Sequence, residues 1–243
     1  MKRMLLTISY DGTAYHGWQV QPNGITVQQT LQDSLEKLLG ERVAVSGCSR
    51  TDAGVHASMF ACHLDCDDCY PENAFLKGLN SLLPNDIAVI DCVQVSKDFH
   101  ARYDAKGKKY VYSFYFGALN PFDSRYMLHL ENDVDVDLMN EFCKGIIGTH
   151  DFAGFSCSKR TVEDTVRTIT ECSVKRQDNK LFFEIKGDGF LYNMVRILAG
   201  TALAVGQKRL SVDCYNEVFK NNDRSKAGDT LPANALCLKE VYY

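Results

Sequence analysis

Residues 47–57 of this chain read GCSRTDAGVHA and lie between two short apolar runs, residues 43–45 and 58–61. Apolar runs of this length that contain β-branched or aromatic residues are typical of strands. Gly47 and Gly54 bracket the segment, and glycine adopts backbone angles that are closed to other residues. The pattern therefore predicts a compact loop between two strands.

Arg50 and Asp52 place a guanidinium and a carboxylate two positions apart in this loop. A carboxylate held beside a cation stays ionised and can act as a nucleophile or a base. An Arg–Asp pair can equally brace a turn, and for an arbitrary pair at this spacing the structural interpretation is the commoner one. The pair taken alone leaves both interpretations open.

The first half of the chain shows the order β-α-β-β-α-β, which is the ferredoxin-like or split βαβ pattern. Thr26 followed by Gln29 forms a capping box that begins a helix, and Gly40 ends it. A second helix is expected between Pro71 and Pro84, because proline is favoured at the first turn of a helix and excluded from its interior. The strands that we expect here are residues 5–10, 43–45, 58–61 and 87–95.

The second half repeats the mixture of strands and helices, without a low-complexity or proline-rich linker between the halves. The sequence therefore predicts an α+β fold of two lobes, residues 1–104 and 105–243, that share one sheet and hold the site between them. For the second lobe we expect extended chain at residues 102–116, strands at 165–176, 181–186 and 236–242, and helices at 137–147, 190–206 and 213–219.

Composition and charge narrow the class of protein. Apolar residues make up 45% of the 243 residues and charged residues 24%, the ordinary mixture of a soluble globular protein. No apolar run reaches the length of a membrane span, and residues 4–10 are too short for a signal-peptide core, so we expect a cytoplasmic protein without membrane association. The net charge of -4 argues against a general nucleic-acid binder, so RNA binding requires local basic clusters. The clusters present are Arg102, Lys106, Lys108 and Lys109 beside Tyr110, and the pairs at residues 159–160 and 208–209.

The chain has ten cysteines, which we expect to be reduced because the chain is neither short nor visibly exported. Cys66 and Cys69 have the C-x-x-C spacing of zinc sites. If the strand that starts near residue 58 continues to Cys66, however, Cys62 and Cys66 lie about 13 Å apart and cannot share an ion. We therefore expect no metal site, with structural zinc as the alternative.

Residues 50–57 resemble the signature of the tRNA pseudouridine synthase A family, and the resemblance covers essentially the whole chain. Residues 231–236 match the family pattern least well, where Ala-Pro followed by Gly-Leu is usual. The other matching segments are residues 10–13, 17–19, 99–102, 109–112, 150–152 and 189–196.

The resemblance implies the pseudouridine synthase fold: two ferredoxin-like lobes that share a central, mostly antiparallel sheet, with helices packed on it and a cleft between the lobes. It also implies a homodimer. Asp52 is similar in position to the family's catalytic carboxylate, and Arg50 to the side chain that helps open the RNA and hold the flipped nucleotide. Tyr110 resembles the ring that packs on the target uracil, and Arg196 the basic partner of Asp52. Taken alone, Tyr110 is typical of a core or edge-strand aromatic, and Arg196 is typical of a solvated helix face.

The implied reaction converts uridine to pseudouridine at positions 38, 39 and 40 of the tRNA anticodon arm. The bond from C1′ to N1 breaks and C1′ joins C5, with no redox change, so no metal or organic cofactor is required. The target base must first leave the stack. Three alternatives stay open: a related enzyme acting on another tRNA or rRNA site, a non-catalytic RNA-binding protein or chaperone, and a metal or redox module.

Overall fold

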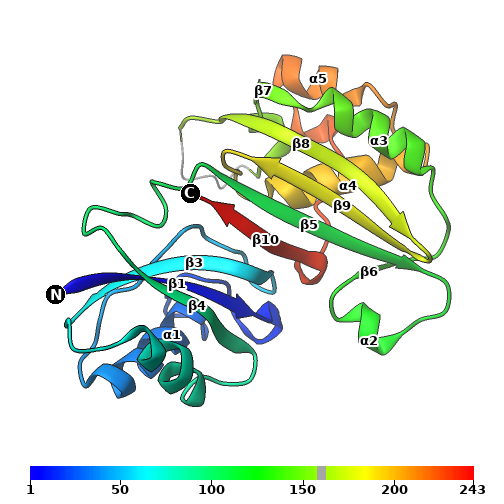
Figure 1. Ribbon diagram of the computed structural model, residues 1–243. Helices are drawn as coiled ribbons and strands as arrows, with labels where there is room; N and C mark the ends of the chain where they lie inside the picture. Colours follow the sequence, from blue (N-terminus) through cyan, green and yellow to red (C-terminus); the bar gives the residue numbers. More distant parts are fainter. Residues whose placement is uncertain (158–162) are drawn as a thin grey trace. The chain divides into compact units, whose positions relative to one another are not determined.

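The computed structural model describes residues 1–157 and 163–243 (Figure 1). The chain forms two compact units, Met1–Lys106 with Cys237–Tyr243, and Gly107–Leu236. Each unit combines strands and helices, so the expected α+β class is confirmed. The basic pair at residues 159–160 lies outside the described residues.

The first unit is built on β1 (Lys2–Tyr10), which pairs antiparallel with β3 (His56–Cys66) and with β4 (Ile87–Val95). On the far side of β3, β10 (Leu236–Tyr242) adds a parallel pairing, and the two-residue β2 (Ser46–Gly47) pairs antiparallel. Alternate side chains of β1 are buried, as expected for a sheet with one covered face.

Helix α1 (Val27–Leu39) begins and ends where the sequence predicts. The Thr26 hydroxyl oxygen accepts a hydrogen bond from the Gln29 N–H at 3.3 Å, and Gly40 ends the helix at φ +79°. The helix packs against the turn Leu79–Ser81. The side chains that it buries recur at helical spacing: Val27, Leu31, Leu35 and Leu39.

The predicted strand at residues 43–45 is wrong. The carbonyl oxygen of Val43 accepts a hydrogen bond from Gln32 Nε2 at 3.0 Å, and that of Val45 accepts one from Gln28 Nε2 at 2.8 Å. Both glutamines belong to α1. Two backbone carbonyls that a strand would use for pairing are therefore satisfied by helix side chains, and the strand starts later, at β2.

Two further expectations need correction. The chain between Pro71 and Pro84 is helical, but it consists of a π-helical turn, Ala74–Gly78, followed by the 3-10 turn Leu79–Ser81. Residues 101–104 form turns, so the extended chain expected from residue 102 begins only at Gly107. The prediction that β3 continues to Cys66 is confirmed.

The second unit is a mostly antiparallel sheet. β9 (Lys180–Gly187) pairs with β5 (Gly107–Phe116) on one side and with β8 (Val166–Gln177) on the other. β7 (Gly148–Asp151) pairs with β8, and β6 (Leu128–Leu130) pairs in parallel with β5. The sequence analysis missed β6 and β7, since strands this short carry little periodicity.

Helices α3 (Val136–Gly145) and α4 (Met194–Gly206) pack on each other, α3 contacts β8 and α4 contacts β5 (Figure 1). α4 begins four residues later than predicted, because Asn193 adopts the left-handed conformation at φ +60° and stops the helix from extending backwards. The remaining helices are α5 (Cys214–Asn221), as expected, and the short α2 (Pro121–Ser124), which the sequence analysis missed.

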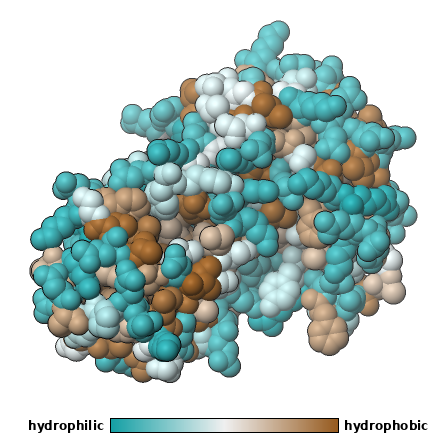
Figure 2. Space-filling model, viewed as in Figure 1, coloured by the Kyte–Doolittle hydropathy of each residue, from teal (hydrophilic) through white to brown (hydrophobic). Residues whose placement is uncertain are grey.

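On the face shown in Figure 2, hydrophilic residues predominate and hydrophobic ones occur in small groups. Among the described residues, no helix has both the length and the apolar character needed to cross a membrane.

Candidate active site

The backbone of the loop that carries Asp52 is fixed by hydrogen bonds to the segment that follows β1. The Trp18 N–H donates to the Thr51 carbonyl at 3.1 Å, and the Gly54 N–H donates to the Tyr15 carbonyl at 3.2 Å. Within the loop, the Val55 N–H donates to the Asp52 carbonyl at 3.2 Å. Backbone hydrogen bonds at Thr51, Asp52 and Gly54 therefore hold the segment that carries the Asp52 carboxylate. Asp52 itself is half-buried.

Two glycines permit this close approach. A Cβ on Gly12 would lie 2.0 Å from the Val55 carbonyl oxygen, and a Cβ on Gly17 would lie 2.4 Å from the Thr51 carbonyl oxygen. Gly17 also has φ +84°, a conformation that favours glycine. The chain after β1 therefore lies directly against the backbone on both sides of Asp52.

The side chains beneath the loop are aromatic. The Tyr10 hydroxyl lies 2.9 Å from Thr51 Oγ1 in the interior of the unit. The Trp18 ring packs on Phe60 with 4.2 Å between ring centroids, and a Cβ on Gly47 would lie 2.6 Å from the indole. The loop thus packs against buried aromatic side chains, which limit how far Asp52 can move.

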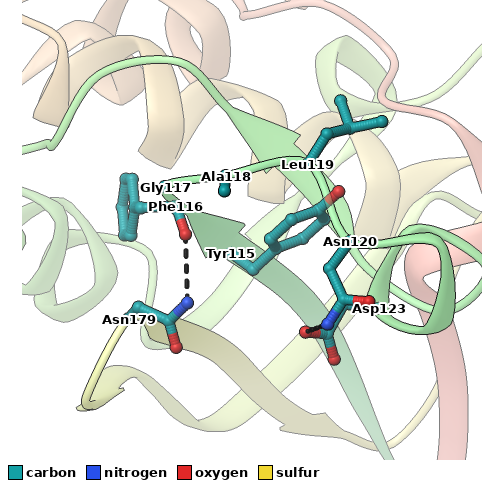
Figure 3. A pocket seen from close by; sticks show the side chains of 8 residues that line it. All are labelled: Tyr115, Phe116, Gly117, Ala118, Leu119, Asn120, Asp123 and Asn179. Carbon is teal, nitrogen blue, oxygen red and sulfur yellow. Dashed lines mark hydrogen bonds between the residues drawn. The ribbon is translucent and has the colours of Figure 1, made fainter.

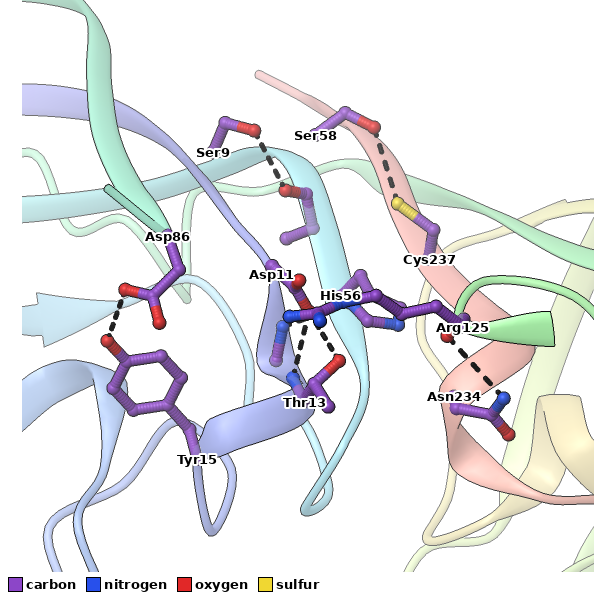
Figure 4. A network of polar contacts seen from close by, with 12 residues as sticks. Ser9, Asp11, Thr13, Tyr15, His56, Ser58, Asp86, Arg125, Asn234 and Cys237 are labelled. Atoms are coloured by element: carbon purple, nitrogen blue, oxygen red, sulfur yellow. Dashed lines mark hydrogen bonds and ion pairs between the residues drawn. The ribbon is translucent and has the colours of Figure 1, made fainter. Parts of the chain in front are cut away.

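His56 closes the other end of the loop (Figure 4). Its Nδ1 lies 3.0 Å from the Gly12 N–H nitrogen and 3.1 Å from Asp11 Oδ1. Only one of these contacts can be a hydrogen bond at a time, because an unprotonated Nδ1 accepts from Gly12 and a protonated Nδ1 donates to Asp11. Asp11 Oδ1 also accepts from the N–H and the hydroxyl of Thr13. Both arrangements tie His56 to the turn after β1.

Tyr15 anchors the same turn to the start of β4. Its hydroxyl donates to Asp86 Oδ1 at 2.6 Å, and the Asp11 N–H donates to the Asp86 carbonyl at 2.9 Å. Burial, together with the hydrogen bond to Asp86, raises the pKa of Tyr15. A neutral Tyr15 therefore keeps donating to Asp86 throughout the ordinary pH range.

Arg50 is exposed, in contrast to its neighbours Thr51 and Asp52. Its position two residues before Asp52 is as predicted, and both belong to the first unit. An exposed arginine on a fixed loop can contact a nucleic-acid backbone or stack on a base without unfolding anything.

Tyr110 and Arg196 belong to the second unit. Tyr110 lies on β5 with only 6% of its surface exposed, and its ring contacts Phe190 edge to face with 5.2 Å between centroids. Arg196 is half-buried in the first turn of α4, and its Nη1 donates to Asn193 Oδ1 at 2.8 Å. Asn193 thus sets both the start of α4 and the direction of the Arg196 side chain, a role that the sequence analysis missed.

The segment that matches the family pattern least well contacts Arg196, and also Tyr112 on β5, through its backbone. Arg196 Nε donates to the Leu231 carbonyl at 2.6 Å, and the Tyr112 hydroxyl donates to the Pro232 carbonyl at 2.8 Å. Burial raises the pKa of Tyr112, while the nearby charge of Arg196 opposes that shift. Because carbonyl oxygens make these contacts, the unusual side chains of residues 231–236 leave them intact.

The cysteine segment shows no arrangement of metal ligands. Cys62 and Cys66 are buried on the continuous strand β3, and Cys69 is exposed beyond its end. Within residues 1–157 and 163–243, no three His, Cys, Asp or Glu side chains come close enough together to hold a metal ion. Burial raises the pKa of both Cys62 and Cys66, which disfavours the thiolate form that binds metals.

Comparison with known proteins adds independent information. A family model described as tRNA pseudouridine synthase matches residues 6–104 and 142–243. The tRNA pseudouridine synthase A of Clostridium kluyveri is 44% identical over 244 residues, and the one of Clostridium acetobutylicum is 42% identical over 248 residues, each covering 100% of both chains. Among solved structures, the crystal structure of the archaeal box H/ACA sRNP Nop10-Cbf5 complex gives a TM-score of 0.35 at 14% identity, over 82% of this chain and 43% of that chain. That last similarity is too distant to bear on the site.

Proposed function

Because this chain belongs to the tRNA pseudouridine synthase family, we propose that it isomerises uridine to pseudouridine at positions 38, 39 and 40 of the tRNA anticodon arm. The observation that carries the proposal is the fixed loop around Asp52, whose backbone is bonded to Trp18 and Tyr15. A carboxylate that must attack one atom gains most from such fixation, since misplacement by about 1 Å can cost roughly a hundredfold in rate.

We assign the chemistry to Asp52. The carboxylate acts on the flipped uridine as the bond between C1′ and N1 breaks, the uracil turns, and C1′ joins C5. The C5 proton leaves and N1 gains a proton, so atoms and charge balance without an oxidant or a cofactor. The same carboxylate can attack the base, attack the sugar or assist an elimination, and each of these roles is compatible with this balance.

The other three residues bind the substrate in this proposal. Arg50, exposed beside Asp52, occupies the space left in the RNA and holds the flipped nucleotide. Tyr110 meets the uracil face, and Arg196, held by Asn193 and Leu231, supplies the positive charge that partners Asp52.

We further propose that the protein works as a homodimer in the cytoplasm, where its tRNA substrate is found. The chain has a net charge of -4, so one copy has little attraction for RNA as a whole. Two copies would bring together the clusters at residues 102–109 and 208–209 and make a longer basic surface. Light scattering that gives a monomer mass for the fully active protein would contradict the dimer.

The experiment that tests the function is pseudouridine mapping in tRNA incubated with the purified protein. The proposal expects new pseudouridine at positions 38 to 40, in the presence of EDTA as well as without it. Pseudouridine at another tRNA or rRNA position would identify a related enzyme with a different target. RNA binding without any pseudouridine would identify a binding protein and reject the enzymatic proposal.

A further inference from the structure

Tyr115 on β5 has a buried hydroxyl group that nothing in the fold explains. The residue is 0% exposed, and among the described residues its hydroxyl oxygen has no hydrogen-bond partner. Leaving such a group unpaired costs about 1–3 kcal/mol. By strand alternation, Tyr115 faces away from the side of β5 that carries Tyr110 and Tyr112. The hydroxyl therefore lies outside the site described above and needs its own explanation.

The hydroxyl belongs to a side chain that lines a cavity of about 450 Å³ within the second unit (Figure 3). Residues 115–120, Asp123 and Asn179 form its walls. In Figure 3 the Tyr115 hydroxyl points towards the segment that carries Leu119 and Asn120. The volume falls within the range of sites that bind small organic groups.

Hydrogen bonds fix the polar side chains of this cavity. Asp123 Oδ1 accepts from Lys180 Nζ at 2.6 Å, and Asp123 Oδ2 accepts from Asn120 Nδ2 at 2.8 Å. Asn179 Nδ2 donates to the Phe116 carbonyl at 3.0 Å, which leaves Oδ1 of Asn179 as an acceptor. Besides the amide N–H groups of Asn120 and Asn179, the lining thus includes the Tyr115 hydroxyl as a donor, and it has acceptors on Asp123 and Asn179.

Charge and shape select the ligand. Asp123 is the one ionised residue of the lining, and Lys180 beside it is already paired with that carboxylate, so the cavity disfavours an anion. The walls combine aromatic Tyr115 and Phe116 with apolar Ala118 and Leu119. A neutral, planar ring with a donor next to an acceptor fits this lining, and nucleobases have that pattern on their Watson–Crick edges.

We propose that this cavity binds one unpaired nucleobase, with the Tyr115 hydroxyl donating to a ring nitrogen or keto oxygen and Asp123 or Asn179 accepting from a ring N–H or amino group. The base comes from the RNA substrate, and to that extent the inference rests on the proposed function. Entry requires residues 117–120 to move off the hydroxyl. Leu119 and Phe122 flank this path with 72% and 87% of their surfaces exposed, and both can pack on the neighbouring nucleotide.

Two Tyr→Phe variants on the same strand test the inference. Tyr115→Phe removes an unpaired hydroxyl, so its unfolding midpoint should equal or exceed that of the wild type. Tyr112→Phe removes a hydroxyl that donates to Pro232, so its unfolding midpoint should fall. For Tyr115→Phe, the affinity for tRNA should nevertheless weaken about five- to tenfold, the effect of one lost hydrogen bond. A Tyr115→Phe variant that is at least as stable as the wild type but binds tRNA more weakly would show that the hydroxyl contacts a ligand.

A base of the RNA and a free nucleotide are distinguished by titration. The wild type and Tyr115→Phe are each titrated with tRNA and with the four nucleoside monophosphates. Loss of affinity for tRNA alone assigns the cavity to a base of the RNA. Binding of a monophosphate that Tyr115→Phe loses assigns the same base chemistry to a free nucleotide. If Tyr115→Phe binds tRNA and every monophosphate like the wild type, the proposal is overturned. Tyr115→Phe should still form pseudouridine at saturating tRNA. A negative binding result would therefore reject the nucleobase site and leave the proposed enzymatic function untouched.

Discussion

The hydroxyl of Tyr10, the last residue of β1, lies 2.9 Å from the hydroxyl of Thr51, the residue immediately before Asp52. Both side chains are buried. The central strand of the first unit and the candidate catalytic loop are therefore joined by one interior hydrogen bond, next to the backbone bond from Trp18. The position of Asp52 is thus set by the core of the unit.

A double-mutant cycle on this pair should show strong coupling. Tyr10→Phe leaves the Thr51 hydroxyl buried without its partner, so we expect a loss of about 1–3 kcal/mol in the free energy of unfolding. Adding Thr51→Val removes the orphaned hydroxyl and should recover part of that loss. Urea unfolding of the two single variants and the double variant measures the coupling, and strictly additive losses would show that the contact contributes nothing.

Gly17→Ala should damage both stability and turnover, whereas Gly40→Ala should damage stability alone. Both glycines have φ near +80°, so each substitution carries the left-handed penalty of about 1–2 kcal/mol. A Cβ on Gly40 meets nothing within 4 Å, but a Cβ on Gly17 lies 2.4 Å from the Thr51 carbonyl oxygen and must push the loop. Single-turnover rates should fall roughly a hundredfold for Gly17→Ala. Equal rates in both variants would mean that the loop tolerates displacement.

Tyr110→Ala and Tyr110→Phe separate the ring from the hydroxyl. If the ring stacks on the uracil, Ala should lose roughly ten- to a hundredfold in turnover efficiency, since base stacking contributes about 1–3 kcal/mol. Phe keeps the ring, and we expect it to bind tRNA normally but to turn over more slowly, with the hydroxyl helping to move the C5 proton. Single-turnover kinetics with tRNA affinity measures both effects. A wild-type rate in Tyr110→Ala would make Tyr110 an ordinary strand aromatic.

Stability should decrease as the pH falls from about 6.5 to about 4, with His63 contributing. Burial, then the nearby charge of Arg3, lowers the pKa of His63 to about 4, and its Nδ1 accepts from the Ala101 N–H at 3.1 Å. Between these pH values the unfolded chain binds a proton that the folded chain does not, so acid favours unfolding, by on the order of 2 kcal/mol at the lower end. Urea unfolding at several pH values should show a shallower pH dependence for His63→Gln. If the free energy of unfolding of His63→Gln depends on pH as steeply as that of the wild type, His63 does not contribute to the acid destabilisation.

Much of the fold follows from local signals in the sequence. Thr26 and Gly40 mark α1 at both ends, and residues 87–95 form β4 as expected. Two of the failures come from contacts distant in sequence or from a single unusual residue. Residues 43–45 lose their strand because Gln28 and Gln32 take their carbonyls, and α4 starts late because Asn193 is left-handed. Neither effect has a signal in hydrophobic periodicity.

The candidate site was predictable only in part. Residues 50–57 mark the loop, and their resemblance to a known signature points to Asp52 as the reactive group. The supports of that loop were not predictable from periodicity. Gly12 and Gly17 matter because they have no side chain, and Asp86 lies far away in sequence, in the turn before β4. One contact of Arg196 could not be predicted for another reason: it goes to the Leu231 carbonyl, and a backbone acceptor leaves no preference for a particular side chain.

The central claim is that Asp52 performs the chemistry, and single-turnover pseudouridine formation by Asp52→Asn tests it most directly. Asn has nearly the same shape but no negative charge, so the loop should stay folded and bind tRNA while the reaction stops. Asp33→Asn, the same change at an exposed carboxylate on α1, is the matched control and should react like the wild type. The account predicts tRNA affinity and unfolding midpoint close to wild type, with no detectable pseudouridine, for Asp52→Asn. A single-turnover rate near that of the wild type would contradict it.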